Sequence, residues 1–358
     1  KAGRSTAEGK TMIRKKPVSG TDRVSVTFMT EDQPEAGSVR LLGDFNAWSL
    51  ERHPMRQRKD GSWGSHPVAD TGLVLLAYLG HCETPLSEEF GQTVTDAIVY
   101  LVNVAVKNKG KLGGNLQNKH WVYEHGIAAY ALAEAYTFCK QLAVNLPNLA
   151  EACQDSIQWI IDNQHKSGGW EYAFSEEGNR GGDLSITAWQ LQALKAALHT
   201  GLEFRNMRGC ISKGVDYVRE RQGNNGAFAY TGKNGKIGLT GAGALCLQQH
   251  KGAANSSARQ GVRFIEKEAQ FKYKAGPANL YGHYYHSQAM INNGGKAWDK
   301  YNELFRDELL NSQNKDGSWP PAGGGGHGTN SASMLTAFCT LMLDVYYRFL
   351  PGTAANQK

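Results

Sequence analysis

Carboxylate and imidazole side chains lie close together at the predicted starts of several helices in this sequence. Glu124 and His125 are adjacent at one start, and Asp183 lies at another. Groups of these types transfer protons to and from a substrate when they are held next to the reacting atoms. Glu124, His125 and Asp183 are therefore our candidate catalytic residues, with helix capping or packing as the alternative for each.

Aromatic and polar side chains near the same helix starts could line a binding site. Indole and phenol rings combine an apolar face with a polar edge, which suits ligands of mixed polarity. The candidate ligand-binding residues are Trp121, Trp170, Glu171, Arg180, Trp189, Tyr230, Tyr284, Tyr285, His286 and His327. A glycine-bounded loop, 168–182, and a second loop with four consecutive glycines, 320–328, could cover a ligand, or they could only pack and connect.

The carboxyl groups allow more than one kind of chemistry. Glycoside hydrolysis uses two carboxyl groups that flank the sugar bond, and Glu124 could pair with either Asp183 or Glu171. A carboxylate at a helix N-terminus is stabilised as the anion. We therefore predict that Asp183 is ionised and is a poor proton donor.

A short motif recurs along the chain and must organise the elements that carry these residues. Residues 57–63, 164–170 and 313–319 each read Gln-x-x-x-Gly-x-Trp, and residues 222–228 have Phe in place of Trp. Similarity at a spacing of tens of residues is typical of repeat architectures. Gln can bond the free carbonyls of a helix end, Gly allows a left-handed turn, and the aromatic ring can cover the end. We predict a structural role for this motif.

Helical periodicity surrounds each copy of the motif. Helices rich in Ala, Gly, Leu and Thr are predicted to form an inner layer, because small residues allow close contact on several sides. The inner candidates are 68–79, 123–138, 184–198, 238–249, 281–291 and 330–346. The outer candidates, which have charged faces, are 88–106, 149–162, 207–221, 256–268 and 296–310. A sixth outer helix is missing from this pattern, so the ring is either closed by residues 49–60 or gapped there.

The repeated motif resembles the QW repeats of squalene cyclases and the related repeats of protein prenyltransferases. This resemblance covers about residues 57–348 and implies a mainly α fold, an α/α toroid of about six helical hairpins. Residues 182–189 are the nearest counterpart of the acidic DxDD motif and retain only Asp183, so we expect no cyclase of that type. The chain has no Asp-x-Cys pair of the prenyltransferase kind, and we expect neither a metal nor a cofactor.

The N-terminal part has a different character. Residues 1–20 are polar and basic and are expected to form a flexible tail, as are residues 349–358. Residues 24–28 and 38–43 alternate as strands do. Residues 21–56, with Gly-Asp-Phe-Asn-Ala-Trp at 43–48, resemble part of an isoamylase-type early-set module, which relates to glycogen-binding domains. The resemblance implies that Trp48 could stack on sugar rings, and it gives a small β segment.

The composition of the chain bears on which partners it could bind and on where it could be located. The net charge of +6 is modest and clusters in the N-terminal tail, which argues against nucleic-acid binding. No apolar stretch is long enough to span a membrane. The six cysteines show no paired spacing and are expected to be buried free thiols. The chain opens with Lys, so both the bacterial cytoplasm and export after loss of a signal remain open.

Three functions are compatible with this sequence. The first is a non-cyclising toroid that acts as a scaffold for a small-molecule or protein ligand. The second is an enzyme, isoprenoid-directed or glycan-directed, that uses the carboxylates and histidines of the rim. The third is a self-assembling structural protein, which would oligomerise through its N-terminal strands.

Overall fold

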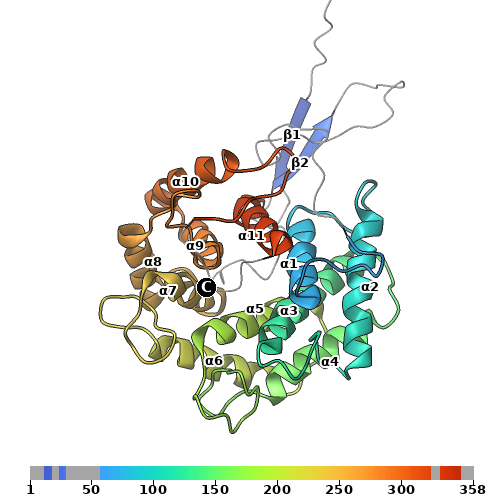
Figure 1. The fold of residues 1–358 in the computed structure, drawn as a ribbon, viewed down its shortest axis with the longest axis horizontal. Helices are drawn as coiled ribbons and strands as arrows, with labels where there is room; N and C mark the ends of the chain where they lie inside the picture. Colours follow the sequence, from blue (N-terminus) through green and yellow to red (C-terminus); the bar gives the residue numbers. More distant parts are fainter. Residues whose placement is uncertain (1–11, 18–23, 30–56, 324–330, 348–358) are drawn as a thin grey trace, which may run out of the picture. The chain divides into compact units, whose positions relative to one another are not determined.

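The computed structural model describes residues 12–17, 24–29, 57–323 and 331–347, which belong to two units, residues 1–43 and 44–358. In the first unit, strands β1 (Met12–Pro17) and β2 (Val24–Met29) pair antiparallel, with Met12 opposite Met29 (Figure 1). The strand expected at 24–28 is confirmed as β2. The tail prediction for 1–20 is wrong at β1, whose backbone groups pair with β2. The strand expected at 38–43 and Trp48 lie outside the described residues.

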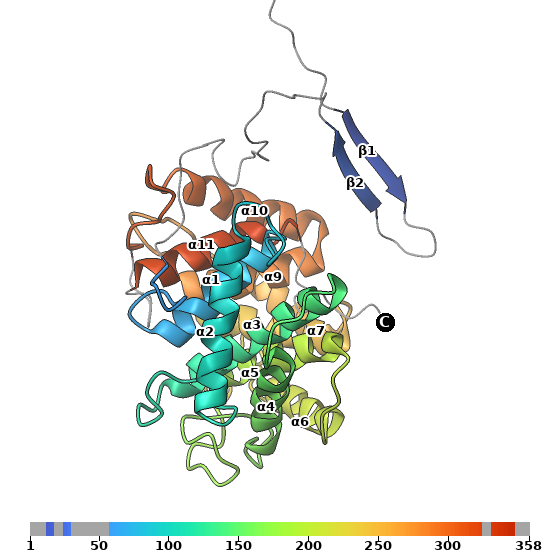
Figure 2. The ribbon, with the colours of Figure 1, turned by 90° about the vertical axis from the view of Figure 1, so that its right-hand side faces the viewer.

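The second unit contains two concentric layers of helices (Figures 1 and 2). The inner helices are α1 (Pro67–Gly80), α3 (Trp121–Gln141), α5 (Leu184–Thr200), α7 (Ile237–Lys251), α9 (Leu280–Asn293) and α11 (Ala332–Asp344). The outer helices are α2 (Gly91–Lys107), α4 (Leu149–Asp162), α6 (Met207–Glu220), α8 (Ser256–Glu268) and α10 (Gly295–Leu310). The α/α toroid and all eleven helices predicted from the sequence are confirmed within the described residues.

The inner ring is closed. Each inner helix packs on the next one in chain order, and α11 returns to pack on α1. Whether residues 49–60 replace the missing sixth outer helix or leave a gap stays a prediction, because residues 49–56 lie outside the described residues. No outer helix follows α10 within the described residues; the turn at residues 57–63 precedes α1, and its Gln57 side chain donates a hydrogen bond to the Thr93 carbonyl of α2, 3.0 Å away.

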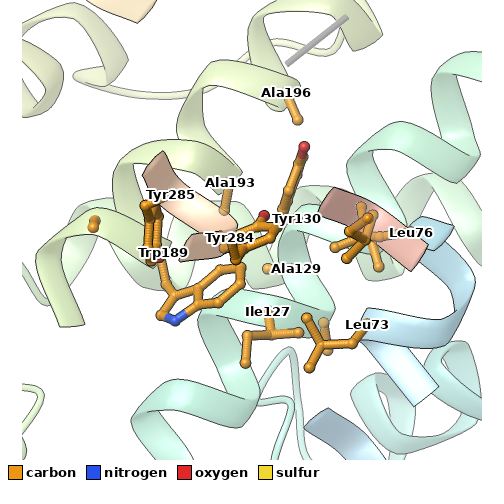
Figure 3. Packing of buried hydrophobic residues seen from close by; sticks show 14 of the residues in the cluster. Leu73, Leu76, Ile127, Ala129, Tyr130, Trp189, Ala193, Ala196, Tyr284 and Tyr285 are labelled. Atoms are coloured by element: carbon orange, nitrogen blue, oxygen red, sulfur yellow. The ribbon is translucent and has the colours of Figure 1, made fainter. Parts of the chain in front are cut away.

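Burial explains why the two layers differ in composition. Along α5, almost every side chain from Leu184 to Ala197 is buried, whereas α4 buries one face and exposes the other. The centre of the ring is filled by packed side chains (Figure 3). There Trp189 stacks on Tyr284 with ring centres 5.3 Å apart, and Leu73 and Ile127 pack nearby. Each large side chain buried in this way stabilises the fold by about 1.5–3 kcal/mol.

The repeated motif links successive outer helices. After α4, the Gln164 side chain donates to the carbonyl of Gly168 at 2.7 Å and to that of Cys210 in α6 at 2.9 Å. Gly168 has φ +93°, and a Cβ atom there would lie 2.4 Å from the Lys213 carbonyl oxygen. Any other residue type at this position is therefore strained. Equivalent bonds join Gln57 to Gly61 and Thr93, and Gln222 to Gly226 and Ser257.

The aromatic residue of each motif is tied to the inner helix that follows. The Trp170 backbone N–H donates to Thr187 Oγ1 at 3.0 Å, and its indole N–H donates to the Ile160 carbonyl at 2.8 Å. The same backbone bond joins Trp63 to Thr71, Phe228 to Thr240, and Trp319 to Thr336. The structural role predicted for the motif is confirmed, and the threonine partner is a feature that the sequence pattern did not reveal.

No helix within the described residues has the length and apolar character needed to cross a bilayer. Five of the six cysteines are buried free thiols, as expected, whereas Cys82 is an exposed free thiol. Cys82 lies in the turn after α1 at φ +67°, outside the apolar helical faces.

Candidate functional site

The starts of the inner helices meet at one end of the ring, which we call the rim. The Tyr281 hydroxyl at the start of α9 donates to the Ser185 carbonyl at the start of α5, 3.3 Å away. Ser331, which precedes α11, donates its hydroxyl proton to Asp70 Oδ2 in α1 at 2.9 Å. These bonds bring together the helix starts from which the sequence predicted a site.

A chain of hydroxyl groups lies on this rim. The Tyr123 hydroxyl of α3 is 2.6 Å from Ser185 Oγ and 3.2 Å from the Tyr172 hydroxyl, which is in turn 3.2 Å from the Tyr230 hydroxyl. Ser185 Oγ donates to Asp183 Oδ1 at 2.7 Å. We call Tyr123, Tyr172, Asp183, Ser185 and Tyr230 the rim cluster. It joins two inner helices to two loops through an almost continuous hydrogen-bonded line.

Asp183 forms the buried base of the rim cluster. It caps α5, because its Oδ1 atom accepts bonds from the backbone N–H groups of Ser185 at 2.9 Å and Ile186 at 3.3 Å. Burial raises the pKa of Asp183 above its ordinary value, although the hydroxyls of Tyr230 and Ser185 and the two N–H groups oppose this effect. The pKa of Asp183 is thus shifted in the opposite direction to the lowering that the helix N-terminus was expected to give. Desolvation outweighs the helix dipole at this position.

Tyr123 and Tyr230 of the rim cluster are neutral proton donors. Burial raises the pKa of Tyr123 and of Tyr230 well above the usual range, and the Asp183 carboxyl raises both further. A phenol of this kind stays protonated at any physiological pH and offers both a donor and an acceptor. Tyr123 and Tyr172 are partly exposed, and Tyr230 is 37% exposed. The cluster therefore presents hydroxyl groups to the solvent with a carboxyl group behind them.

A loop between Trp170 and α5 completes this part of the rim. Its Glu171 is buried, and Oε2 accepts a 2.6 Å bond from the backbone N–H of Arg180. The Arg180 guanidinium then lies over the rings of Tyr172 and Tyr230, at 5.1 and 5.7 Å from their centres. Glu171 thus holds the loop, while Arg180 and Tyr230 reach the predicted binding surface.

Glu124 lies on a different part of the rim from Asp183. Its Oε2 atom accepts a 2.6 Å bond from the Gly114 N–H, and the side chain is half-buried. Burial raises the pKa of Glu124, and the Asp70 carboxyl raises it further. Burial raises the pKa of Asp70 as well. The carboxyl group whose charge acts on Glu124 is thus Asp70, which our predicted pairs did not include.

The two predicted histidines among the described residues have positions in the core. His125 is buried, with Nδ1 2.9 Å from the Leu112 backbone nitrogen and Nε2 3.0 Å from the Ser156 carbonyl oxygen. Burial lowers its pKa to about 3. Its Nδ1 atom accepts the backbone N–H of Leu112, just as a threonine Oγ1 atom accepts the backbone N–H of the aromatic residue in each motif turn. His286 is also buried, 2.9 Å from the Ile237 carbonyl oxygen, and burial lowers its pKa to about 4.

Most of the aromatic residues that were predicted to bind a ligand also lie in the core. Trp170, Trp189, Tyr284 and Tyr285 are buried, and the last three pack on one another (Figure 3). Trp121 is half-buried and packs against Phe174 and His125. His327 and Trp48 lie outside the described residues. Among the described residues, the rim therefore gathers Glu124, Asp183, Arg180 and Tyr230 from the predicted set, and the other predicted residues there lie in structural positions.

Sequence reasoning missed several residues of the rim. His120, Lys119 and Tyr281 lie beside the rim cluster, and none of them was a candidate. His120 and Lys119 precede α3 by one and two residues, so proximity to a predicted helix start was the available signal. Among the described residues, no group of three or more His, Cys, Asp or Glu side chains is arranged to hold a metal ion.

Comparisons of sequence give short matches. No protein-family model matches the chain. A 1,4-α-glucan branching enzyme from Photobacterium profundum is 46% identical over 48 residues, which are 13% of this chain and 6% of that enzyme. Another from Xanthomonas oryzae pv. oryzae is 57% identical over 30 residues, 8% of this chain and 4% of that enzyme. The chain thus spans only a small part of the length of these enzymes.

Comparisons of structure cover most of the chain. A cellobiose 2-epimerase from Bacillus thermoamylovorans superposes with a TM-score of 0.57 at 12% identity, over 85% of this chain and 95% of the epimerase. A GH76 α-mannanase from Bacteroides thetaiotaomicron gives 0.52 at 13% identity, over 80% and 88%. At such identities the likeness concerns the fold, an α/α toroid. It does not extend to the finer resemblance to squalene cyclases and prenyltransferases.

Proposed function

We propose that the helical unit binds a saccharide at the rim and performs acid–base chemistry on it. The rim cluster is the observation that carries this proposal, because three tyrosine hydroxyls in line can exchange hydrogen bonds with a hydroxyl-rich ligand. The rings of Tyr172 and Tyr230 add apolar surface that suits the C–H faces of a sugar. The carbohydrate-active enzymes that share the toroid support the same assignment.

Two carboxyl groups are available for proton transfer. Glu124 is the partly exposed one, and its raised pKa keeps it protonated to a higher pH than an ordinary glutamate. We propose Glu124 as the group that donates a proton to the substrate. Asp183 is buried behind the tyrosines and acts through Ser185 and Tyr230, so we propose it as a positioning residue.

Activity assays on a panel of oligosaccharides test this proposal. We expect product formation that falls as the pH rises through the pKa of Glu124, because the acid form is then lost. Glu124→Gln should abolish activity, and Asp183→Asn should lower it by about 100-fold or less, as expected for a group that acts through others. Glu151→Gln, on the exposed face of α4, is the matched control. Full activity in Glu124→Gln would remove it from the catalytic role.

A saccharide-binding scaffold without turnover is the second candidate. It agrees with the scaffold hypothesis drawn from the sequence, and the same rim cluster would supply the binding surface. Binding without product formation from any oligosaccharide of the panel would favour it. The short match to 1,4-α-glucan branching enzymes and the early-set resemblance of residues 21–56 support a glycan ligand in both cases.

A further inference from the structure

Two cationic side chains and one imidazole ring surround Tyr172 at the edge of the rim cluster. The Arg180 guanidinium lies 5.1 Å from the Tyr172 ring centre, and Lys119 Nζ lies 5.6 Å from it. The His120 ring meets the Tyr172 ring edge-on, with centres 5.4 Å apart. Arg180, Lys119 and His120 are all exposed. We call these three residues the cation group.

No acidic partner neutralises the cation group within the described part of the chain. None of the ion pairs formed there involves Arg180 or Lys119. In the same loop as Arg180, Glu177 is paired with Lys166 at 3.2 Å, and Glu171 is buried and bonded to a backbone N–H. Asp183 is buried and accepts bonds from the start of α5. The positive charge at this edge is therefore available to a ligand.

The cation group is also held in place. The 2.6 Å bond from the Arg180 backbone to Glu171 fixes the loop, and the ring faces of Tyr172 and Tyr230 attract the guanidinium. Arginine offers a planar fork of donors that matches the two oxygens of a carboxylate or sulfate. A guanidinium restrained beside a row of hydroxyls can therefore bind an anionic group while the hydroxyls bind the rest of the ligand.

We infer that the rim selects a saccharide that carries an anionic group, a carboxylate or a sulfate ester, and that Arg180 and Lys119 bind this group. The inference rests on the proposed function, since the rim cluster supplies the contacts to the sugar itself. A purely neutral oligosaccharide would leave the exposed charges of Arg180 and Lys119 without partners beside it.

Calorimetric titration with matched sugars tests the inference. The probes are cellotriose and maltotriose, the same trimers oxidised at C6 to uronates, and the same trimers carrying 6-sulfate. We expect at least about tenfold tighter binding of one anionic form than of its neutral parent, because charge-assisted hydrogen bonds are stronger than neutral ones. Added salt should reduce this preference. The comparison of uronate with sulfate shows which anion is selected.

Substitutions test whether the cation group causes the tighter binding of the anionic trimers. Arg180→Met and Lys119→Met should each weaken binding of the anionic trimer several-fold more than binding of the neutral trimer, and so lower the ratio of anionic to neutral affinity. Arg208→Met on α6 and Lys107→Met on α2 remove exposed charges from the outer layer and should leave the ratio unchanged. Equal loss in these controls would mean that net charge, and not this site, sets the preference, which would overturn the inference.

The remaining outcomes separate this inference from the proposed function. Neutral trimers bound as tightly as their anionic forms would overturn the inference and leave saccharide binding at the rim intact. Absence of binding by any probe would count against both. Anionic preference that is retained in Arg180→Met and in Lys119→Met would also overturn the inference, because the anion would then be bound elsewhere.

Discussion

The threonine that accepts the backbone N–H of each motif aromatic offers a sharp test of the repeat architecture. Thr187 is fully buried, and its Oγ1 atom accepts the Trp170 N–H at 3.0 Å. Thr187→Val keeps the shape of the side chain and removes this acceptor. Because the volume is retained, no cavity contributes to the change. The Trp170 N–H is left buried without its partner.

The expected loss follows from that unpaired donor. A buried N–H group without an acceptor costs about 1–3 kcal/mol. Thr137→Val is the matched control, because Thr137 is also buried in an inner helix, and its hydroxyl only donates to the Ala133 carbonyl at 2.9 Å. That carbonyl keeps its place in the helix ladder, so we expect a loss below about 1 kcal/mol in the control.

Equilibrium unfolding in guanidinium chloride, followed by far-ultraviolet circular dichroism and tryptophan fluorescence, measures both changes in the free energy of unfolding. The equivalent changes at Thr71, Thr240 and Thr336 should resemble Thr187→Val, because each accepts the same bond. If Thr187→Val were no more destabilising than Thr137→Val, the bond would not hold the repeat together and the reasoning would be refuted.

Three further predictions concern stability and reactivity. Gly168→Ala should destabilise the protein by at least about 1 kcal/mol, because φ is +93° and the added Cβ atom would meet a carbonyl oxygen. Gly181→Ala is the control, since its φ is +70° but the space around it is open, and it should destabilise the protein less. Thermal unfolding compares the two variants. Burial raises the pKa of Asp344 to about 8 despite the opposing charge of His81. As the pH rises from 4 to 8, this group should therefore lower the free energy of unfolding by up to about 1.4 kcal/mol per pH unit. Asp344→Asn should therefore unfold at a higher temperature than the parent at pH 8 and lose that advantage near pH 4, and an equal difference at both pH values would contradict this. A thiol reagent should modify Cys82 first in the native protein, as mass spectrometry can show, and equally fast labelling of all six thiols would disagree with their burial.

The helices could be predicted because their signals are local. Small residues recur along the inner helices, and apolar residues recur at helical spacing between charges along α4 and the other outer helices. The motif glycines and glutamines marked the turns between them. The strand β1 was missed, because it is short and three of its six residues are basic, and only pairing with β2 gives its backbone a partner.

The site could be predicted only in part because burial decides what each residue type does. His125 and Glu124 are adjacent in the sequence, yet one faces the core and the other faces the rim. Tyr172 and Tyr230 come from loops without periodicity, so no pattern linked them to Tyr123. The raised pKa of Asp183 depends on desolvation, which a helix-dipole argument from the sequence cannot weigh.

Hydrogen–deuterium exchange with and without oligosaccharide tests the central claim most directly, since it locates bound sugar along the chain. The ligands are the neutral, oxidised and sulfated trimers described above, each at saturating concentration. We predict protection of residues 119–124, 170–186 and 228–237, which carry the rim cluster and the cation group. Protection confined to the opposite end of the ring, or no protection at these segments by a trimer that calorimetry shows to be bound, would contradict the account.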